Sequence, residues 1–317
     1  MHRKRLLCLI LAFVSLLLLC ACPSGSPPEA PPEPPEPPEE QTPARSGMGT
    51  YESPDFSDAV FNAAEAVGNA NSHIDLTSVS DGYVAVSAVS ESRLKFQVVK
   101  DDITYNYDIS SQGLPSIFPL QSGDGTYLFR IMENVTESKY TELYSASSEV
   151  QIKDEFQPFI RPNSYVNYSR ASNCVKIASE MASTAADAPD LVAEIYRFIV
   201  ANIKYDSEKA ATVKSGYMPD PDETLASGKG ICFDFASLAA AMLRSQGIPA
   251  KLICGYVAPN DLYHAWNMFY TPQTGWITVD YEVTGDSWNR IDLTFAAGGA
   301  NADFIGDGTN YTDLYTY

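Results

Sequence analysis

One cysteine of this chain stands where a thiol could act as a nucleophile. Cys232 follows the glycine-containing segment SGKGI and begins the apolar pattern CFDFASLAAAMLRSQG, which predicts a helix that ends near Gly247. Free backbone N–H groups and the helix dipole at such a start stabilise a thiolate. The same N–H groups can stabilise the oxyanion that forms when a thiolate attacks a carbonyl group. The position of Cys232 therefore predicts nucleophilic catalysis.

The thiol needs a base, and one histidine lies in the same part of the chain. Of the three histidines, His2 belongs to the N-terminal segment and His73 to a separate strand-rich region, which leaves His264 in the predicted strand YHAWNMFYT. Asp280 ends the stretch GWITVD of the next predicted strand. Adjacent antiparallel strands joined by the turn TPQTG would set the imidazole and the carboxylate side by side. Asp280 could then orient His264, and His264 could hold Cys232 as the thiolate.

The remaining candidates near this stretch have structural interpretations. The chain has six cysteines, and Cys174 and Cys254 fall in apolar periodic runs, where small buried side chains are expected. Trp266 and Trp276 could stack on a substrate, but tryptophans so placed mostly pack the strand layer. Tyr205, just before the loop that leads to the cysteine, is a candidate second donor to the oxyanion.

The N-terminus reads as a lipoprotein signal peptide over residues 1–21. A basic start, HRKR, precedes an apolar run that is short for a spanning helix and is followed by Pro and Gly. The end, LCAC, resembles the bacterial lipobox, which implies that Cys22 is acylated and becomes the first mature residue. An ordinary signal peptide cut near Ala21, or an uncleaved membrane anchor, are the alternatives. The segment predicts a protein anchored by lipid on the outer face of the cell membrane, at a Gram-positive surface.

Residues 22–50 are predicted to be a disordered stalk. The sequence PSGSPPEAPPEPPEPPEEQTPARSG favours extended polyproline II, and its glutamates repel one another. Such a composition cannot bury a core. The stalk would lift the folded part away from the membrane.

Residues 51–160 are predicted to form a β-sandwich accessory domain. A short helix is expected from about Ser53 to Asn71, and then the apolar pattern changes to a period of two. Short strands joined by hairpin-like loops favour a sandwich. Tyr105, Tyr107 and Tyr127 could line a binding face, but packing within the sandwich is the more common role of strand tyrosines. The expected strands are 82–89, 94–100, 103–110, 126–135 and 139–152.

Residues 165–317 are predicted to form a separate α+β domain. Apolar residues at three- and four-residue intervals indicate helices first, and alternating segments indicate antiparallel strands afterwards. The expected helices are 170–183, 188–204 and 232–247, and the expected strands are 251–258, 263–271 and 275–283.

Charge and motif content exclude several function classes. Lys and Arg number 21 against 40 Asp and Glu, which gives a formal charge of −19 and argues against binding nucleic acid. A hydrophobic fraction of 45% is ordinary for a globular core. No GxGxxG, P-loop, CxxC or HExxH pattern occurs, and three histidines cannot form a His cluster. The sequence therefore predicts neither a cofactor nor a metal site.

Residues 195–285 resemble the bacterial transglutaminase-like superfamily. The segments that carry the resemblance are LASGKGICFDFASLAAAMLRSQGIPAKLICGYV and HAWNMFYTPQTGWITVD. A glycine-rich approach to a cysteine at a helix start, a GIPA strand entry, His-Ala-Trp-Asn and a Trp-containing strand that ends in Asp occur in the family's order. The resemblance implies a papain-like fold with Cys232 as nucleophile, His264 as base and Asp280 as the orienting residue.

Two further segments extend the resemblance. RIDLTFAA looks like the family's Asp-Pro-Thr-Phe continuation, with Leu293 in place of the proline, and makes Asp292 the alternative third member of the triad. The strand-rich region is similar to an accessory domain found beside this core in Gram-positive surface proteins.

The predicted reaction is acyl transfer from a protein or cell-wall peptide amide through a thioester. Water as the acceptor would make a protease or amidase, and an amine would make a cross-linking transglutaminase. The alternative is a transglutaminase-like lipoprotein that is catalytically silent and serves binding or scaffolding.

Overall fold

The structure, a computed structural model of the chain, describes residues 50–258, 262–278 and 311–317. The predicted signal peptide and the predicted stalk up to residue 49, with Cys22, lie outside these residues, as do Asp280 and Asp292. Residues 46–317 belong to one compact unit. Within the described residues, no helix is long and apolar enough to cross a bilayer.

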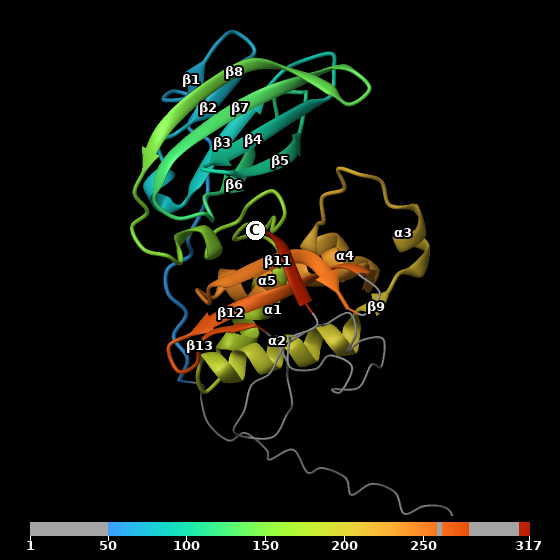
Figure 1. Ribbon diagram of the computed structural model, residues 1–317. Helices are drawn as coiled ribbons and strands as arrows, with labels where there is room; N and C mark the ends of the chain where they lie inside the picture. Colours follow the sequence, from blue (N-terminus) through green and yellow to red (C-terminus); the bar gives the residue numbers. More distant parts are fainter. Residues whose placement is uncertain (1–49, 259–261, 279–310) are drawn as a thin grey trace, which may run out of the picture. The chain divides into compact units, whose positions relative to one another are not determined.

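Two antiparallel four-stranded sheets form the strand-rich region (Figure 1). Alternation decides which side chains turn inward: Leu94, Phe96 and Val98 are buried, whereas the residues between them are partly exposed. Phe96 stacks on Phe118 of the other sheet, with ring centroids 5.4 Å apart, so the two sheets pack face to face. Burial of each such ring contributes about 2–3 kcal/mol. The first sheet has the order β1 (Val67–Gly68), β2 (Ser72–Asp75), β3 (Tyr83–Ala88), β6 (Ser116–Pro119), and the second has the order β5 (Ile103–Ile109), β4 (Leu94–Lys100), β7 (Gly125–Thr136), β8 (Lys139–Val150).

The tyrosines of this region pack inside it. Tyr107 and Tyr127 are almost fully buried, and the ring of Tyr107 lies 4.1 Å from that of Phe118, centroid to centroid. Tyr105 stacks beside Tyr107. The packing interpretation is therefore confirmed for Tyr107 and Tyr127.

The helix predicted from Ser53 to Asn71 is wrong. This segment runs without helix and ends in the short strand β1. Its backbone forms hydrogen bonds with distant side chains instead. The Val60 N–H donates to the Tyr83 hydroxyl over 3.1 Å, and the Asn62 N–H donates to Asp75 Oδ2 over 2.6 Å. These partners replace the hydrogen bonds that a helix would supply, so the local alanine content does not decide the structure.

The remaining elements form a layer of helices against a four-stranded antiparallel sheet. The helices are α1 (Asn173–Ala182), α2 (Ala188–Asn202), α3 (Ser207–Thr212), α4 (Pro221–Ser227) and α5 (Cys232–Ser245). The sheet has the order β13 (Gly275–Thr278), β12 (Leu262–Thr271), β11 (Ala250–Val257), β14 (Tyr311–Thr316). A separate parallel pair joins β9 (Lys204–Tyr205) to β10 (Lys229–Gly230). Two single-turn 3-10 helices, η1 (Val79–Asp81) and η2 (Gln157–Phe159), precede α1 in the sequence. The three long helices match the prediction, as do β11, β12 and the described part of the strand predicted at 275–283, whereas α3, α4, β9, β10 and β14 were not predicted.

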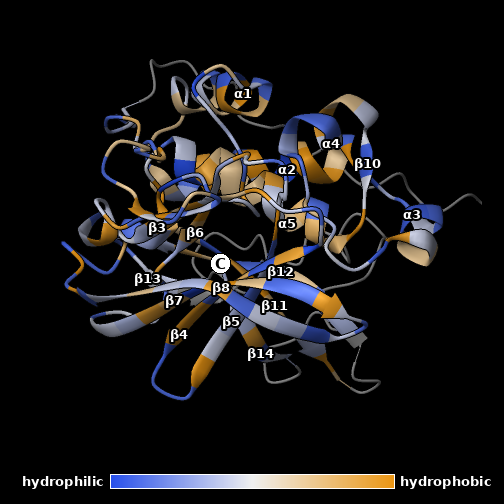
Figure 2. Cartoon of the chain, turned by 90° about the horizontal axis from the view of Figure 1, so that it is seen from above, coloured by the Kyte–Doolittle hydropathy of each residue, from blue (hydrophilic) through white to orange (hydrophobic). Residues whose placement is uncertain are grey.

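Helix α5 is the buried centre of this layer. Every residue from Asp234 to Ser245 is buried, and the apolar ones share a core with α1, α2 and β11. A helix that is apolar on all sides must be covered on all sides. Figure 2 shows the contrast between the apolar central helices and the hydrophilic α3 at the edge.

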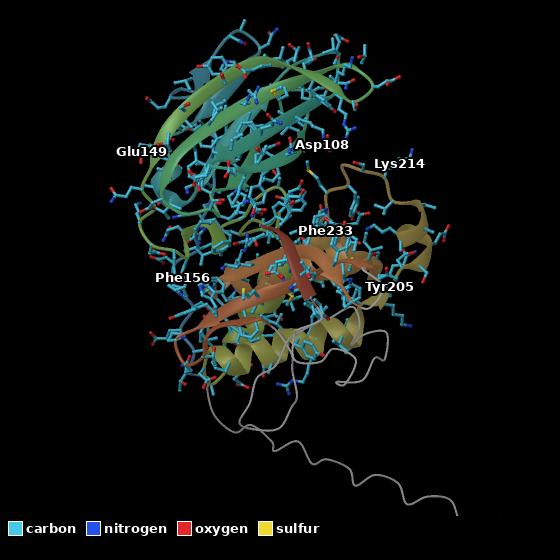
Figure 3. All side chains as sticks on the ribbon, viewed as in Figure 1. Asp108, Glu149, Phe156, Tyr205, Lys214 and Phe233 are labelled. Atoms are coloured by element: carbon cyan, nitrogen blue, oxygen red, sulfur yellow. The ribbon has the colours of Figure 1, made fainter. Side chains whose placement is uncertain are left out.

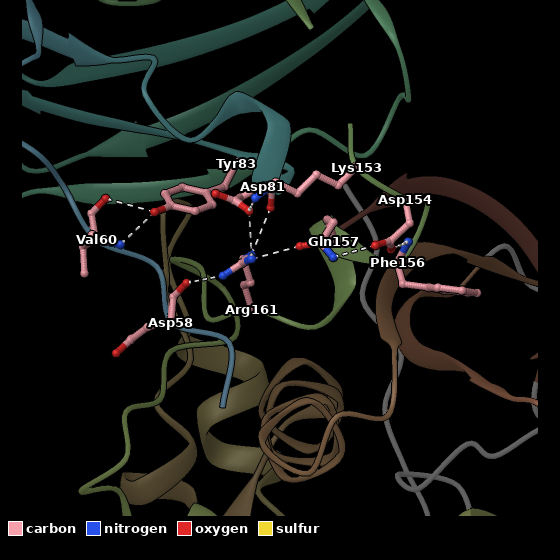
Figure 4. Close-up of polar contacts among 9 residues, drawn as sticks. All are labelled: Asp58, Val60, Asp81, Tyr83, Lys153, Asp154, Phe156, Gln157 and Arg161. Carbon is pink, nitrogen blue, oxygen red and sulfur yellow. Dashed lines mark hydrogen bonds and ion pairs between the residues drawn. The ribbon is translucent and has the colours of Figure 1, made fainter. Parts of the chain in front are cut away.

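Arginines join the strand-rich region to the helical layer. Arg161 pairs with Asp81 over 3.1 Å and donates to the Asp58 carbonyl over 2.7 Å (Figure 4). Arg244, buried at the end of α5, donates to the carbonyl oxygens of Ala250, Arg161 and Tyr317 over 2.8–2.9 Å. Because the donors of a buried guanidinium need acceptors, Arg244 ties the end of α5 to the three segments that supply these carbonyl oxygens.

Candidate active site

Cys232 is the first residue of α5, as predicted, and its side chain is half-buried. The approach to it is held by β9 and β10, in which Tyr205 pairs with Gly230. Tyr205 and the residue after the cysteine, Phe233, are labelled in Figure 3. Partial burial, and then the nearby Cys232 sulfur, raise the pKa of Tyr205. Tyr205 therefore keeps its proton at neutral pH.

A buried carboxylate fixes the first turn of α5. Asp234 Oδ2 accepts the Ile231 N–H over 2.8 Å and pairs with Lys209 Nζ over 2.8 Å, while Oδ1 accepts the Tyr217 hydroxyl over 2.5 Å. Asp234 has no exposed side-chain surface. A Cβ at Gly230 would stand 2.6 Å from that of Asp234, so only glycine fits there. We name this group of Lys209, Tyr217 and Asp234 the brace.

The brace was not predicted, although the sequence carried a signal for it. An acidic residue at the third helical position commonly accepts the N–H of the residue before the helix, and Asp234 does so. Its two other partners lie on α3 and on the loop after it, which periodicity does not place. Partial burial lowers the pKa of Lys209, but the hydrogen bonds to Asp234 and Tyr217 outweigh it and raise the pKa overall. Burial and the hydrogen bond to Asp234 raise the pKa of Tyr217 to about 12.

His264 lies near the start of β12. Burial, and then the nearby Cys254 sulfur, raise the pKa of the preceding residue, Tyr263. His264 itself is buried and pairs with Gly255 across the sheet.

Alternation along β12 decides which face each side chain takes. Asn267 donates to the Ala236 carbonyl of α5 over 2.9 Å, and Ala265 belongs to the core that α5 shares. The ring of His264 instead stacks with that of Trp266, with centroids 6.4 Å apart, on the other face. The imidazole of His264 therefore lies on the sheet face of Trp266.

Cys174 and Cys254 are buried, as predicted, and both are free thiols. Burial raises the pKa of both, to about 12 for Cys254. A thiol with such a pKa is uncharged at neutral pH and is a poor nucleophile. Both remain predicted not to take part in catalysis.

Residues 141–281 match the family model described as the transglutaminase-like superfamily. The matched range contains Cys232, His264 and Asp280. The chain carries a transglutaminase-like domain. Its helical layer and antiparallel sheet have the mixed α/β composition of a papain-like fold.

Similar proteins include two from bacteria whose sequences match the transglutaminase-like domain. An uncharacterized protein of Mycobacterium tuberculosis is 34% identical over 95 residues, which are 26% of this chain and 27% of the relative. The protein-glutamine gamma-glutamyltransferase of Pseudomonas aeruginosa is 30% identical over 117 residues, 33% of this chain and 17% of that protein. A solved structure, described as a candidate cysteine protease from Cytophaga hutchinsonii, covers 80% of this chain and 73% of its own at 15% identity, with a TM-score of 0.38. The matched part is thus about a quarter of the mycobacterial relative's length.

The tryptophans of the transglutaminase-like domain pack as predicted. Trp266 is buried with Ile253 and Val257 on the sheet face away from α5. Trp276 contacts the rings of Phe156 and Phe159, and the Lys251 ammonium lies 3.9 Å above its ring. Among the described residues, no group of three or more His, Cys, Asp or Glu side chains could hold a metal ion.

Proposed function

We propose that the transglutaminase-like domain is a cysteine acyltransferase or hydrolase, with Cys232 as nucleophile, His264 as base and Asp280 as the residue that orients the imidazole. One observation carries the proposal. A half-buried thiol stands on the first residue of the buried helix α5, and the brace holds that helix start in place. Fixed N–H groups at the point where charge develops are what acyl transfer requires.

The reaction follows from these groups. The Cys232 thiolate attacks the carbonyl carbon of an amide, and the oxyanion accepts N–H hydrogen bonds from the start of α5. The carbon–nitrogen bond breaks as His264 gives the departing nitrogen a proton, and a thioester remains. Water or an amine then attacks the thioester, with His264 accepting the proton of the attacking group, and the thiolate is released.

The proposed substrate is a protein or a cell-wall peptide outside the cell. The lipobox-like end at Cys22 and the stalk after it support a lipid-anchored protein at the membrane surface. Replacement of Cys22 by Ser is expected to release the protein from membranes or to leave the signal peptide uncleaved. Unchanged cleavage together with unchanged partitioning into detergent would argue against the anchor.

A glutamine-containing peptide library tests the chemistry. The full mature chain is incubated with the library, with and without a primary amine, and the products are read by mass spectrometry. Conversion of glutamine to glutamate or cleavage of the peptide indicates hydrolysis, and replacement of the glutamine ammonia by the amine indicates transamidation. Cys232→Ala should abolish the products, and Cys174→Ala, which removes a buried thiol, serves as the matched control.

A catalytically silent domain is the second candidate, and one observation favours it. The imidazole of His264 stacks with Trp266 on the face of the sheet opposite to that of Asn267, which contacts α5. The rate of Cys232 alkylation against pH decides between the two. An activated thiolate alkylates well below the ordinary thiol pKa of about 8.5, whereas a silent domain would follow that ordinary value.

A further inference from the structure

Aromatic contacts run from the strand-rich region to the first turn of α5. The ring of Tyr107, which is buried in the sandwich, lies 5.8 Å from that of Tyr165, centroid to centroid. The ring of Tyr165 lies 5.5 Å from that of Phe233, the residue after Cys232. Tyr165 therefore packs against the core of the strand-rich region on one side and against the first turn of α5 on the other.

The backbone of Tyr165 is held as well as its ring. Its N–H donates to Asn163 Oδ1 over 2.9 Å. Its carbonyl oxygen accepts the hydroxyl of Ser237 over 2.6 Å, and Ser237 is buried in α5 one turn after Phe233. Because close-packed interiors transmit a displacement rather than absorb it, this anchored ring restricts where Phe233 can lie.

A second route from the strand-rich region reaches the same turn. Asp108 of β5, labelled in Figure 3, pairs with Arg93 over 2.8 Å. Gly216, in the loop between α3 and α4, has a φ of +84° and lies against Asp108, where a Cβ would stand 3.1 Å from the carboxylate. The next residue of that loop, Tyr217, belongs to the brace and donates to Asp234 in the first turn of α5. Strand β5 therefore meets this turn by an aromatic route and by the brace.

The position of this turn matters for the proposed reaction. N–H groups at a helix start stabilise a thiolate or an oxyanion only within the first turn. A displacement of about 1 Å at a reacting group can lower the rate about a hundredfold. Phe233 is only partly buried, so neighbours outside α5 must fix its ring and the backbone that it shares with Cys232.

We propose that the strand-rich region positions the first turn of α5 for acyl transfer, with Tyr165 as its positioning residue. Tyr165 holds the ring of Phe233 and, through it, the N–H groups and the thiol at the start of the helix. Tyr165 acts without contacting the substrate. The effect on the rate rests on the proposed function of Cys232, whereas the effect on the order of the turn does not need catalysis.

Hydrogen exchange of the full mature chain measures the order of the turn without a substrate. Tyr165→Ala removes the ring and should speed exchange over residues 231–237 about threefold to tenfold relative to residues 238–245 of the same helix. Tyr165→Phe keeps the ring and should exchange like the parent. Phe129→Leu is the matched control, because Phe129 is buried and stacks within the sandwich. It should leave the ratio between the two halves of α5 unchanged.

Alkylation and kinetics then test the consequence for Cys232. In Tyr165→Ala, the ratio of the iodoacetamide rate at about pH 7 to that at about pH 10 should fall about twofold to fivefold, because the helix start stabilises the thiolate less well. On a peptide that the parent turns over, kcat should fall while KM stays close to that of the parent. Tyr165→Phe should keep the parent's values of exchange, alkylation ratio and kcat, which a general loss of stability would not explain.

Three results would overturn the proposal. They are unchanged exchange over residues 231–237 in Tyr165→Ala, an equal rise along the whole of α5, and an unchanged alkylation ratio despite faster exchange. If Tyr165→Ala does not fold, Phe233→Leu removes the same ring contact from the other side and is measured in its place. Absence of turnover in the parent would count against the proposed function alone, because exchange and alkylation are read without a substrate.

Discussion

Lys209 of α3 and Asp234 of α5 form an ion pair of 2.8 Å that joins a surface helix to the first turn of the buried helix α5. Asp234 is fully buried, whereas Lys209 keeps 28% of its side-chain surface exposed. Asp234 also accepts hydrogen bonds from the Ile231 N–H and the Tyr217 hydroxyl, so both of its carboxylate oxygens have partners. The ion pair therefore holds Asp234 where its carboxylate fixes Ile231, the residue before Cys232.

Removal of Asp234 should destabilise the protein strongly. Asp234→Ala leaves the Ile231 N–H and the Tyr217 hydroxyl without their acceptor, and the expected cost is about 3 kcal/mol. Urea unfolding measures it. Glu208→Ala, an exposed change on α3 beside Lys209, is the matched control and should stay within about 0.5 kcal/mol of the parent. A loss in Asp234→Ala no larger than in this control would mean that the brace is not structural.

The contribution of Lys209 should disappear at high pH. Its pKa is raised in the folded protein, so the stabilisation is fully present below the unfolded value of about 10.4 and is lost as pH rises through the folded value. Tyr217, with a pKa of about 12, stays protonated over most of this range. The difference in unfolding free energy between wild type and Lys209→Met should be constant from about pH 6 to 9 and shrink above about pH 10.5. A difference that is unchanged at high pH would point to packing instead of charge.

Alkylation should distinguish Cys232 from the two buried thiols. Burial raises the pKa of Cys174 and Cys254, and neither is exposed to reagent. Iodoacetamide at neutral pH should therefore modify Cys232 in the native mature chain and all three thiols in guanidinium. Peptide mapping by mass spectrometry reads the sites. Native labelling of Cys254 at a rate comparable to that of Cys232 would contradict the structure.

The boundary of the folded part should lie close to Thr50. The Tyr51 hydroxyl donates to the Gln246 carbonyl over 2.7 Å, and Pro54 packs where a Cβ of Gly247 would stand. A chain that begins at Thr50 should melt like the full mature chain. One that begins at Phe56 loses these contacts at the end of α5 and should be about 1–2 kcal/mol less stable in urea. If the chain that begins at Thr50 melted several degrees below the full mature chain, the stalk would have to pack on the folded part.

Periodicity predicted the elements that bury a continuous face and missed those held by tertiary contacts. The strand Leu94–Lys100 and the helix that begins at Cys232 follow from alternation and from an apolar run. The segment before β1 does not, because the Tyr83 hydroxyl and the Asp75 carboxylate bind its backbone. In the site, the start of α5 was predictable, but Lys209 and Tyr217 reach Asp234 from segments whose spacing carries no signal.

The proposed triad should behave as one unit. Cys232→Ala and His264→Ala should abolish turnover, because thiolate attack and protonation of the departing amine have no substitute. Asp280→Asn should keep measurable activity, since this carboxylate orients and stabilises the imidazole without exchanging the substrate's proton. The double variant of Cys232 and Asp280 should be no worse than Cys232→Ala alone, as expected of residues that act together. Initial rates on one peptide, with every variant checked for its melting temperature, provide the measurement.

Asp292 tests the identity of the third member. If Asp280 orients His264, Asp292→Ala should leave the rate close to that of wild type, and Asp280→Ala should lower it by a factor of about 10³–10⁴, the size seen when the orienting carboxylate of a triad is removed. The reverse order of defects would transfer the role to Asp292. The pH profile separates orientation from folding: loss of the orienting carboxylate should lower the apparent pKa of the base, because a carboxylate stabilises the imidazolium, whereas a merely unstable variant would keep the profile and lose amplitude. Full activity of Cys232→Ala on a substrate of the wild type would remove the cysteine mechanism altogether, whatever the order of the two aspartates.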